Sequence, residues 1–177
     1  MKQLPKLNLK LEPILKESYV TLHPTTGWSY YKEWPIDRWE QVVAAFPHIK
    51  FIQIGLSTDT KVKGCDHSFM NTDLMTSIAL IANAKAHLGG DSFSNHVTYM
   101  SNTPAIILWG STQHDASGYE QNINVSLGLS CQPCWKEKEG MSSMPRGKCE
   151  NLVDGCHACM AGITSDMIIK ELTNLLV

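Results

Sequence analysis

The sequence predicts an α/β fold built on a parallel sheet, and three observations support this prediction. Short β-rich runs alternate with helical patterns from Tyr19 onward, which is typical of β–α–β units joined by right-handed crossovers. The run from Ala105 to Gly110 is apolar throughout, as expected of a strand covered on both faces. Five of the six cysteines lie within residues 131–159. We therefore expect a Rossmann-like, doubly wound sheet with a cysteine-rich metal finger inserted near the C-terminus.

The predicted elements follow one another along the chain in that alternating order. Residues 1–17 contain the breakers Pro5 and Pro13 and are expected to form an irregular leader. Strands are expected at Tyr19–His23, Phe51–Gly55, Ala86–Gly90, Ala105–Gly110 and Asn122–Leu127. Helices are expected at residues 35–46, 74–82, 94–102 and 164–176, each with a Pro, Asp, Ser or Thr that suits its first turn.

Composition limits the function classes that the chain can serve. Its 177 residues, 43% of them hydrophobic, suit one domain over residues 1–177. The formal net charge of -2 argues against nucleic acid and acidic membrane surfaces as partners, because no basic excess exists to neutralise phosphates. The sequence contains no apolar run of about 18 residues and no secretory signal pattern. We therefore expect a cytoplasmic protein without a membrane span.

The loop after the first predicted strand carries groups that suit a phosphate. In parallel sheets of this kind, ligands bind beyond the carboxyl ends of the strands. The first strand ends in the sequence HPTTGWSYYKEWP, which supplies the hydroxyls of Thr25 and Thr26 and the cation of Lys32. Hydroxyls, loop amides and one lysine together can bind a phosphate group. The alternative is a surface loop whose lysine is solvated.

The third predicted strand ends in GGDSFSNH, which predicts a second anion-binding element. Asp91 or Ser92 can cap the helix that follows, and the free N–H groups of that helix then face the ligand. Asp91 is placed to hold sugar hydroxyls, and His96 lies one turn into the helix. The alternative is a capping Asp–Ser pair with a helix-packing histidine. The fourth strand ends in WGST, so three strand ends together predict a nucleotide-phosphate site without a Walker or dinucleotide motif.

These motifs, in the order LHPTTG, K-x-W-P, FIQIG, GGDSFSNH and TPAIILWGST, resemble the C-terminal half of glycosyltransferase family 9. That family comprises the heptosyltransferases of lipopolysaccharide assembly and their relatives, which have the two-domain GT-B fold. The resemblance implies a donor-binding Rossmann domain for a nucleotide-diphosphate sugar such as ADP-heptose. Carried onto this sequence, Thr25, Thr26, Lys32 and Ser92 would bind the donor phosphates. Asp91 would hold the donor sugar, and His96 would lie beside the diphosphate.

Two features differ from the family pattern. Phe93 stands where the family has glycine, and the loop between Thr26 and Lys32 is slightly longer than usual, so the resemblance does not fix the sugar. The family's N-terminal domain supplies the acceptor site and a carboxylate general base, and no segment here is long enough to be that domain. We therefore expect no catalytic residue in this chain, no activity of the chain alone, and an acceptor-binding domain or a second copy as partner. The alternative is a non-catalytic nucleotide-binding or metal-finger scaffold.

The cysteine-rich finger, residues 130–160, contains two C-x-x-C motifs, Cys131–Cys134 and Cys156–Cys159, with Cys149 between them. Paired C-x-x-C motifs predict tetrahedral thiolate coordination of a structural metal, zinc or iron. Some family relatives carry a four-cysteine finger that holds iron, and this resemblance implies Cys131, Cys134, Cys149 and Cys159 as ligands. Cys156 or His157 is the alternative fourth ligand, and free thiols or disulfides are the alternative to a metal.

Overall fold

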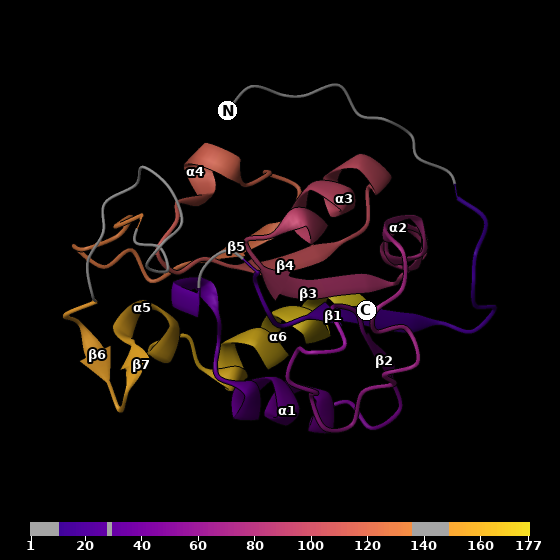
Figure 1. The fold of residues 1–177 in the computed structure, drawn as a ribbon, viewed down its shortest axis with the longest axis horizontal. Coiled ribbons are helices and arrows are strands. Elements are labelled where there is room, and N and C mark those ends of the chain that lie inside the picture. The colour runs from indigo at the N-terminus through magenta and orange to yellow at the C-terminus, as the bar shows by residue number, and fades with distance from the viewer. Residues whose placement is uncertain (1–10, 28–29, 136–148) are drawn as a thin grey trace.

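The computed structural model describes residues 11–27, 30–135 and 149–177. Its main sheet has five strands in the order β2-β1-β3-β4-β5, and every neighbouring pair is parallel (Figure 1). The strands are β1 (Tyr19–His23), β2 (Lys50–Gln53), β3 (Ala86–Gly90), β4 (Ala105–Leu108) and β5 (Ile123–Val125). The predicted parallel α/β sheet is therefore confirmed, with β2, β4 and β5 ending earlier than the sequence pattern indicates.

Helices cover both faces of this sheet. On one face lie α1 (Ile36–Ala44) and α6 (Ser165–Leu176), and on the other lie α2 (Leu74–Ala82) and α3 (Phe93–Ser101) (Figure 1). Successive side chains of β1 point to opposite faces of the sheet. Leu22 packs in the core with α1 and α6, whereas Tyr19 packs in the core with α2 and α3. This explains why the central strands are apolar on both faces.

Helix caps bear out part of the sequence reading. The Asp73 carboxylate accepts the Thr76 amide at 3.0 Å and so caps α2, as its position predicts. Thr164 caps α6 by accepting the Met167 amide at 3.3 Å. Ser92 occupies the N-cap position of α3, but its side chain makes no capping hydrogen bond. The first-turn amides of α3 are thus not satisfied by their own N-cap side chain.

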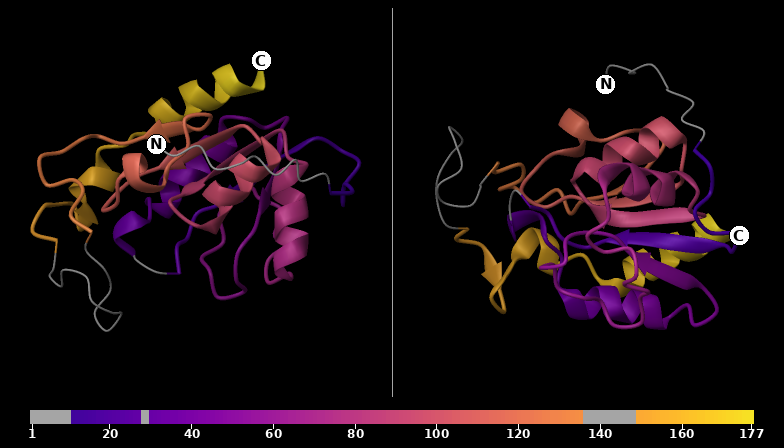
Figure 2. Two further views of the ribbon diagram at one scale, coloured as in Figure 1. Left: turned by 90° about the horizontal axis from the view of Figure 1, so that it is seen from above. Right: turned by 45° about the vertical axis from the view of Figure 1, so that its right-hand side comes forward.

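Several short elements have no counterpart in the sequence prediction. A 3-10 turn, η1 (Tyr30–Lys32), follows β1, and α4 (His114–Ser117) follows β4. The cysteine-rich segment contains a two-stranded antiparallel hairpin of β6 (Leu152–Val153) and β7 (Cys156–His157), followed by α5 (Ala158–Ala161). Figure 2 shows this hairpin and α5 at one end of the molecule, away from the C-terminus of α6.

The predictions for the leader and for the finger can be compared with the structure only in part, because some of their residues lie outside the described ranges. Residues 11–17 of the leader form no helix or strand, whereas residues 1–10 of the leader and residues 136–148 of the finger lie outside the described ranges. None of the helices within those ranges is long and apolar enough to cross a bilayer.

The strand order locates the ligand-binding edge. The chain runs outward from β1 to β2 and then returns across β1 to β3, so the direction of winding reverses between β1 and β3. Ligands of open α/β sheets bind outside the carboxyl ends of the strands at such a reversal. The residues after His23 and Gly90 are therefore where a binding site is expected.

Candidate functional site

A buried ion pair joins the loops that leave β1 and β3. The ammonium of Lys32 in η1 lies 2.8 Å from Asp91 Oδ2 and also donates to the Asp91 carbonyl at 3.3 Å. Both residues are more than nine-tenths buried. Two predicted site residues that are 59 positions apart in sequence are thus brought into direct contact.

Thr26 lies beside this pair against the end of β3. A Cβ atom on Gly90 would come within 3.4 Å of both the Lys32 carbonyl and the Thr26 methyl group. The end of β3 therefore packs against both η1 and the threonine loop at this point. The Thr26 amide donates to the Glu33 carboxylate at 3.1 Å, so that carboxylate fixes the loop between β1 and η1. Thr25 is half-buried in the same loop.

The hydroxyl of Ser92 belongs to a polar chain that starts on β1. Ser92 Oγ lies 3.1 Å from His23 Nδ1 and 2.9 Å from Ser94 Oγ. Ser92 makes no capping hydrogen bond to the first amides of α3, and a helix N-terminus without a side-chain cap attracts anions. That the start of α3 faces an anionic ligand stays a prediction.

His23 is a site residue that sequence reasoning missed. Burial lowers its pKa to about 4, partly offset by the charge of Asp59, so the imidazole is neutral near pH 7. The Phe93 ring meets it edge-on with centroids 5.3 Å apart, which gives a packing role to the residue that replaces the family glycine. The available signal was its position, because His23 is the last residue of the strand that leads into the threonine loop.

His96 is placed differently from the other predicted residues. It is exposed on α3, and its Nδ1 lies 2.8 Å from the Tyr119 hydroxyl, with the two rings edge to face. No described contact joins it to Lys32 or Asp91. Its predicted place beside a diphosphate stays a prediction.

The end of β4 carries two buried hydroxyls that have no described partner. Ser111 is 1% exposed and Thr112 is 3% exposed, and neither side-chain oxygen has a hydrogen-bond partner among the described residues. The first C-x-x-C motif lies against the same loop, because Trp135 donates its amide to the Ser111 carbonyl at 2.8 Å and Gln132 donates to the Gly110 carbonyl at 2.7 Å.

The cysteines gather beyond this loop, but they do not form a metal centre in the structure. Three of them, Cys131, Cys134 and Cys149, line one cavity of about 360 Å³ together with Glu150 and Asn151. Burial, together with the smaller effect of the neighbouring thiols of these three cysteines, raises the pKa of Cys159 to about 11. All six cysteines are free thiols. Within residues 11–27, 30–135 and 149–177 no three His, Cys, Asp or Glu side chains are arranged to hold a metal ion, so the predicted metal finger is unsupported.

Solved structures with the same fold are glycosyltransferases. The iron-containing dodecameric glycosyltransferase TibC from enterotoxigenic E. coli H10407 matches over 96% of this chain with a TM-score of 0.78 and 16% identity. ADP-heptose lps heptosyltransferase II from E. coli matches over 91% with a TM-score of 0.69 and 18% identity. The E. coli heptosyltransferase WaaC with ADP matches over 92% with a TM-score of 0.63 and 13% identity. At these identities the likeness shows the fold.

The chain spans about half the length of these proteins, since it covers 48%, 47% and 46% of them respectively. No curated protein matches it. The family model of glycosyltransferase family 9 (heptosyltransferase) matches residues 2–144, which is most of the chain and includes β1 to β5. This chain therefore belongs to glycosyltransferase family 9.

Proposed function

We propose that this chain is the donor-binding domain of a GT-B heptosyltransferase that acts in the cytoplasm. It binds a nucleotide-diphosphate sugar, and the sugar, a heptose, passes to an acceptor hydroxyl on lipopolysaccharide or on a protein. The observation that carries the proposal is the Lys32–Asp91 pair at the reversal between β1 and β3, beside the uncapped start of α3. A cation, a carboxylate and a helix N-terminus at one sheet edge suit a ligand that contains both phosphates and sugar hydroxyls.

Each group has a distinct task in this proposal. Lys32, the threonine hydroxyls and the α3 amides stabilise the negative charge that grows on the diphosphate as the bond to the sugar carbon breaks. Asp91 accepts hydrogen bonds from the sugar and holds Lys32 in place until the phosphates arrive. The buried hydroxyls of Ser111 and Thr112 support a polar ligand nearby, because buried hydroxyls are rarely left without partners.

The donor class is supported by two of the matched structures. TibC has been described in complex with ADP-D-beta-D-heptose, and WaaC with ADP. ADP-heptose is therefore the first donor to test. Because the chain spans about half of these proteins, we propose that the base which removes the acceptor's proton comes from a separate acceptor-binding domain or a partner, and that the isolated chain transfers little sugar.

Binding measurements test the donor site. We expect calorimetry to detect ADP-heptose and ADP, and Lys32→Ala to weaken binding by about 1.5–3 kcal/mol, the range for a charge-assisted hydrogen bond. Because this variant also breaks a buried ion pair, its folding is checked by circular dichroism. The variant Lys32→Gln with Asp91→Asn removes both charges together and should bind ADP, which lacks the donor sugar, as weakly as Lys32→Ala does. Lys50→Gln, a lysine at the opposite edge of the sheet, is the matched control. Wild-type affinity in the folded Lys32 variants rules out the phosphate assignment.

A transfer assay separates the enzyme from the alternative of a non-catalytic scaffold. Adding a family acceptor-binding domain to the chain should produce sugar transfer from ADP-heptose. Donor binding without transfer in the reconstituted mixture would favour the scaffold. Robust turnover by the chain alone would show that it contains a base of its own.

We also propose that Cys131, Cys134, Cys149 and Cys159 bind one structural zinc or iron ion, with Cys156 as the alternative fourth ligand. Three of the four thiols line one cavity, and thiolates are the ligands that structural zinc and iron sites use. TibC is described as iron-containing. Four thiolates leave no open position on the ion, so its role would be to order the segment around it.

Elemental analysis of protein purified under reducing conditions tests this metal site. We expect one zinc or iron per chain, and its loss in Cys134→Ser. Cys65→Ser, which changes a cysteine outside the cluster, should keep the metal. Retention of the metal in Cys159→Ser together with its loss in Cys156→Ser would correct the fourth ligand. Metal-free protein would overturn the proposal.

A further inference from the structure

The loop that carries Lys32 is held from two sides. On one side Asp91 accepts the Lys32 ammonium. On the other side lies the second C-x-x-C motif, whose His157 ring packs against both tyrosines of η1. The ring centroids of Tyr31 and His157 are 4.5 Å apart, and those of Tyr30 and His157 are 5.6 Å apart. A buried aromatic side chain thus stands directly before the lysine in sequence and against the histidine in space.

Tyr30 and Tyr31 contact each other as well as His157. Their rings lie 4.3 Å apart, and the Tyr30 hydroxyl donates to the Tyr31 hydroxyl at 3.0 Å. Tyr31 is only 5% exposed and its ring contacts that of His157, so it has little freedom to move independently of the histidine. Because η1 is a single turn of three residues, the direction of the Tyr31 side chain and that of Lys32 are set by the same short stretch of backbone.

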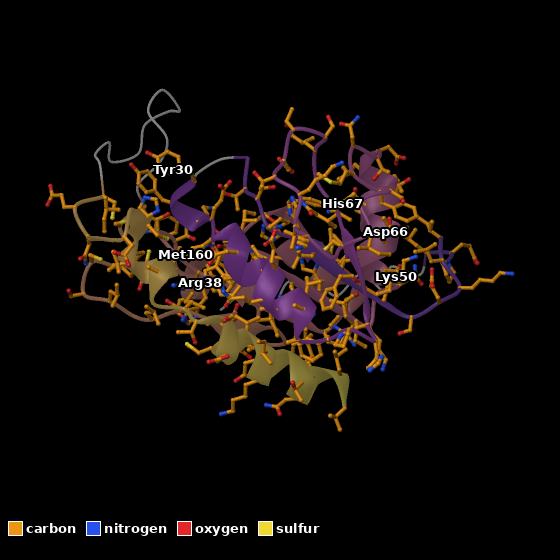
Figure 3. The ribbon with its side chains drawn as sticks, turned by 90° about the horizontal axis from the view of Figure 1, so that it is seen from below. Tyr30, Arg38, Lys50, Asp66, His67 and Met160 are labelled. Atoms are coloured by element: carbon orange, nitrogen blue, oxygen red, sulfur yellow. The ribbon has the colours of Figure 1, made fainter. Side chains whose placement is uncertain are left out.

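The segment that carries His157 is itself anchored to the chain after η1. The Trp34 indole donates to the Ile163 carbonyl at 2.9 Å. The Arg38 guanidinium donates to the carbonyls of Met160, Ala161 and Ile163, which close the end of α5. Figure 3 shows Tyr30, Arg38 and Met160 on one side of the molecule, away from Lys50, Asp66 and His67.

Gly110, which follows β4, packs closely against both η1 and α5. A Cβ atom there would lie 2.6 Å from the Tyr31 carbonyl and 2.9 Å from Met160 Sδ. The end of β4, the turn η1 and the helix α5 therefore meet with no space for a methyl group between them. A shift of α5 and His157 must be passed on to η1, because packed groups of this kind do not deform independently.

We propose that His157 is a positioning residue for Lys32. Its ring fixes Tyr31 and so holds the lysine ammonium at the Asp91 carboxylate, where the donor phosphates are proposed to bind. The inference deepens the proposed function and rests on it for the ligand. The placement of Lys32 by His157 can be tested without any ligand.

The ligand-free test measures the reactivity of Lys32. Reductive methylation of the intact chain, followed by peptide mass spectrometry, reports how often the Lys32 amine leaves its buried pair. In wild type Lys32 should react far more slowly than Lys50, whose side chain is 34% exposed. His157→Ala should raise the Lys32 rate by about 5- to 10-fold, a factor that lies within the range of coupling between residues in contact. His157→Phe, which keeps an aromatic ring against Tyr31, should restore the slow rate.

His67→Ala is the matched control. His67 is also partly buried and its Nε2 lies 3.0 Å from the Val62 carbonyl, but it lies on the other side of the molecule from η1 (Figure 3). Its removal should leave the Lys32 rate unchanged. An unchanged Lys32 rate in folded His157→Ala overturns the inference. So does a rise that His67→Ala reproduces, because general loosening would then explain it.

Nucleotide affinity then separates this inference from the proposed function. ADP binding should weaken by about 5- to 10-fold in His157→Ala and recover in His157→Phe. In the Lys32→Gln, Asp91→Asn background, His157→Ala should have no further effect, because the group it positions is gone. An equal effect in both backgrounds overturns the positioning role. His157→Ala could raise the Lys32 methylation rate while substitution of Lys32 leaves the ADP affinity unchanged. That result would keep the positioning role of His157 and reject Lys32 as a phosphate-binding residue.

Discussion

Among the residues that the structure describes, Lys32 and Lys50 make ion pairs with carboxylates, and the surroundings of these two lysines differ in nearly every physical respect. Lys32 meets Asp91 in the interior, with side chains 8% and 10% exposed. Lys50 at the start of β2 meets Glu17 at 2.6 Å and Asp66 at 3.3 Å, with side chains 34%, 56% and 27% exposed. The first pair links the loops after β1 and β3, whereas the second lies at the edge strand of the sheet.

The difference in burial favours the Lys32–Asp91 pair, rather than the pairs of Lys50, as part of the proposed binding site. Taking two charges out of water costs several kcal/mol for each ion, and their attraction repays that cost only in good geometry. Hydrophobic side chains would stabilise the interior at least as well as Lys32 and Asp91, so stability alone does not explain them. An exposed pair such as that of Lys50 needs no such explanation, because water and salt screen it.

Breaking the buried pair is the largest effect we expect. Lys32→Ala leaves the Asp91 carboxylate buried without its cation and should lower the free energy of unfolding by about 3–5 kcal/mol. Urea denaturation at pH 7.5 measures this loss. The double variant Lys32→Gln with Asp91→Asn removes both charges and should recover more than half of it. Equal losses in the single and double variants would show that burial of the charges is not what distinguishes this pair.

The packing beside the pair gives the second effect. Gly110→Ala places a methyl group 2.6 Å from the Tyr31 carbonyl and should cost about 3 kcal/mol of unfolding free energy, toward the upper end for overpacking. Gly27→Ala, in the loop between β1 and η1, has no described atom within 4 Å of the new Cβ and should change stability by less than about 0.5 kcal/mol. Similar values from urea denaturation would contradict the close packing of β4, η1 and α5.

The sequence predicts the strands well and the contacts between their ends poorly. Strand β3 matches its predicted bounds, and Asp73 caps α2 as expected, because periodicity and capping are local properties. The pairing of Lys32 with Asp91 depends on the strand order that places β1 next to β3, and no local pattern fixes that order. The individual site residues were chosen from loop chemistry and family resemblance, and the pair between two of them was not foreseen.

The cysteine-rich segment shows the same limit more strongly. Its hairpin and α5 are too short for a periodic signal, and α5 is fixed by Trp34 and Arg38, which are more than 120 positions away. His157 was considered as a metal ligand, whereas the structure places its ring against Tyr31. The role of a residue is hardest to predict from sequence when its contacts are with residues far away in the chain.

Acidification should destabilise the fold through two buried histidines, His23 at the end of β1 and His87 in β3. Burial lowers the pKa of His23 to about 4 and that of His87 to about 3, and the two imidazoles also repel each other when charged. Both titrate near 6.5 in the unfolded chain, so below that pH the unfolded state binds more protons. Their contribution to stability is complete above pH 6.5 and is lost progressively as the pH falls through about 4 and about 3.

Replacing one histidine checks this pH dependence. His87→Leu should reduce the loss of unfolding free energy between pH 7 and pH 5 by about 1–2 kcal/mol, measured by urea denaturation at both pH values. The variant removes His87 Nδ1, which lies 3.0 Å from the Thr21 hydroxyl, but that hydroxyl also donates to the Ala86 carbonyl at 3.5 Å. The Lys50 edge should not respond over this range, since hydrogen bonds from Ser68 lower the pKa of Asp66 below its usual range. If His87→Leu loses as much unfolding free energy between pH 7 and pH 5 as the wild type does, the buried imidazole of His87 is not the cause of the loss.

The smallest effect belongs to the exposed pair. Lys50→Gln removes the cation that pairs with both Glu17 and Asp66. Both carboxylates remain hydrated at the surface, so neither is left in a buried site. The midpoint of thermal unfolding should shift by less than about 2 °C in low salt, and the shift should vanish in about 0.5 M salt, where the screening length is only a few ångströms. The loss in Lys32→Ala should persist in the same salt, because buried charges are screened much less. A Lys50 effect as large and as salt-resistant as that of Lys32 would show that position in the sheet, rather than burial, sets the strength of both pairs.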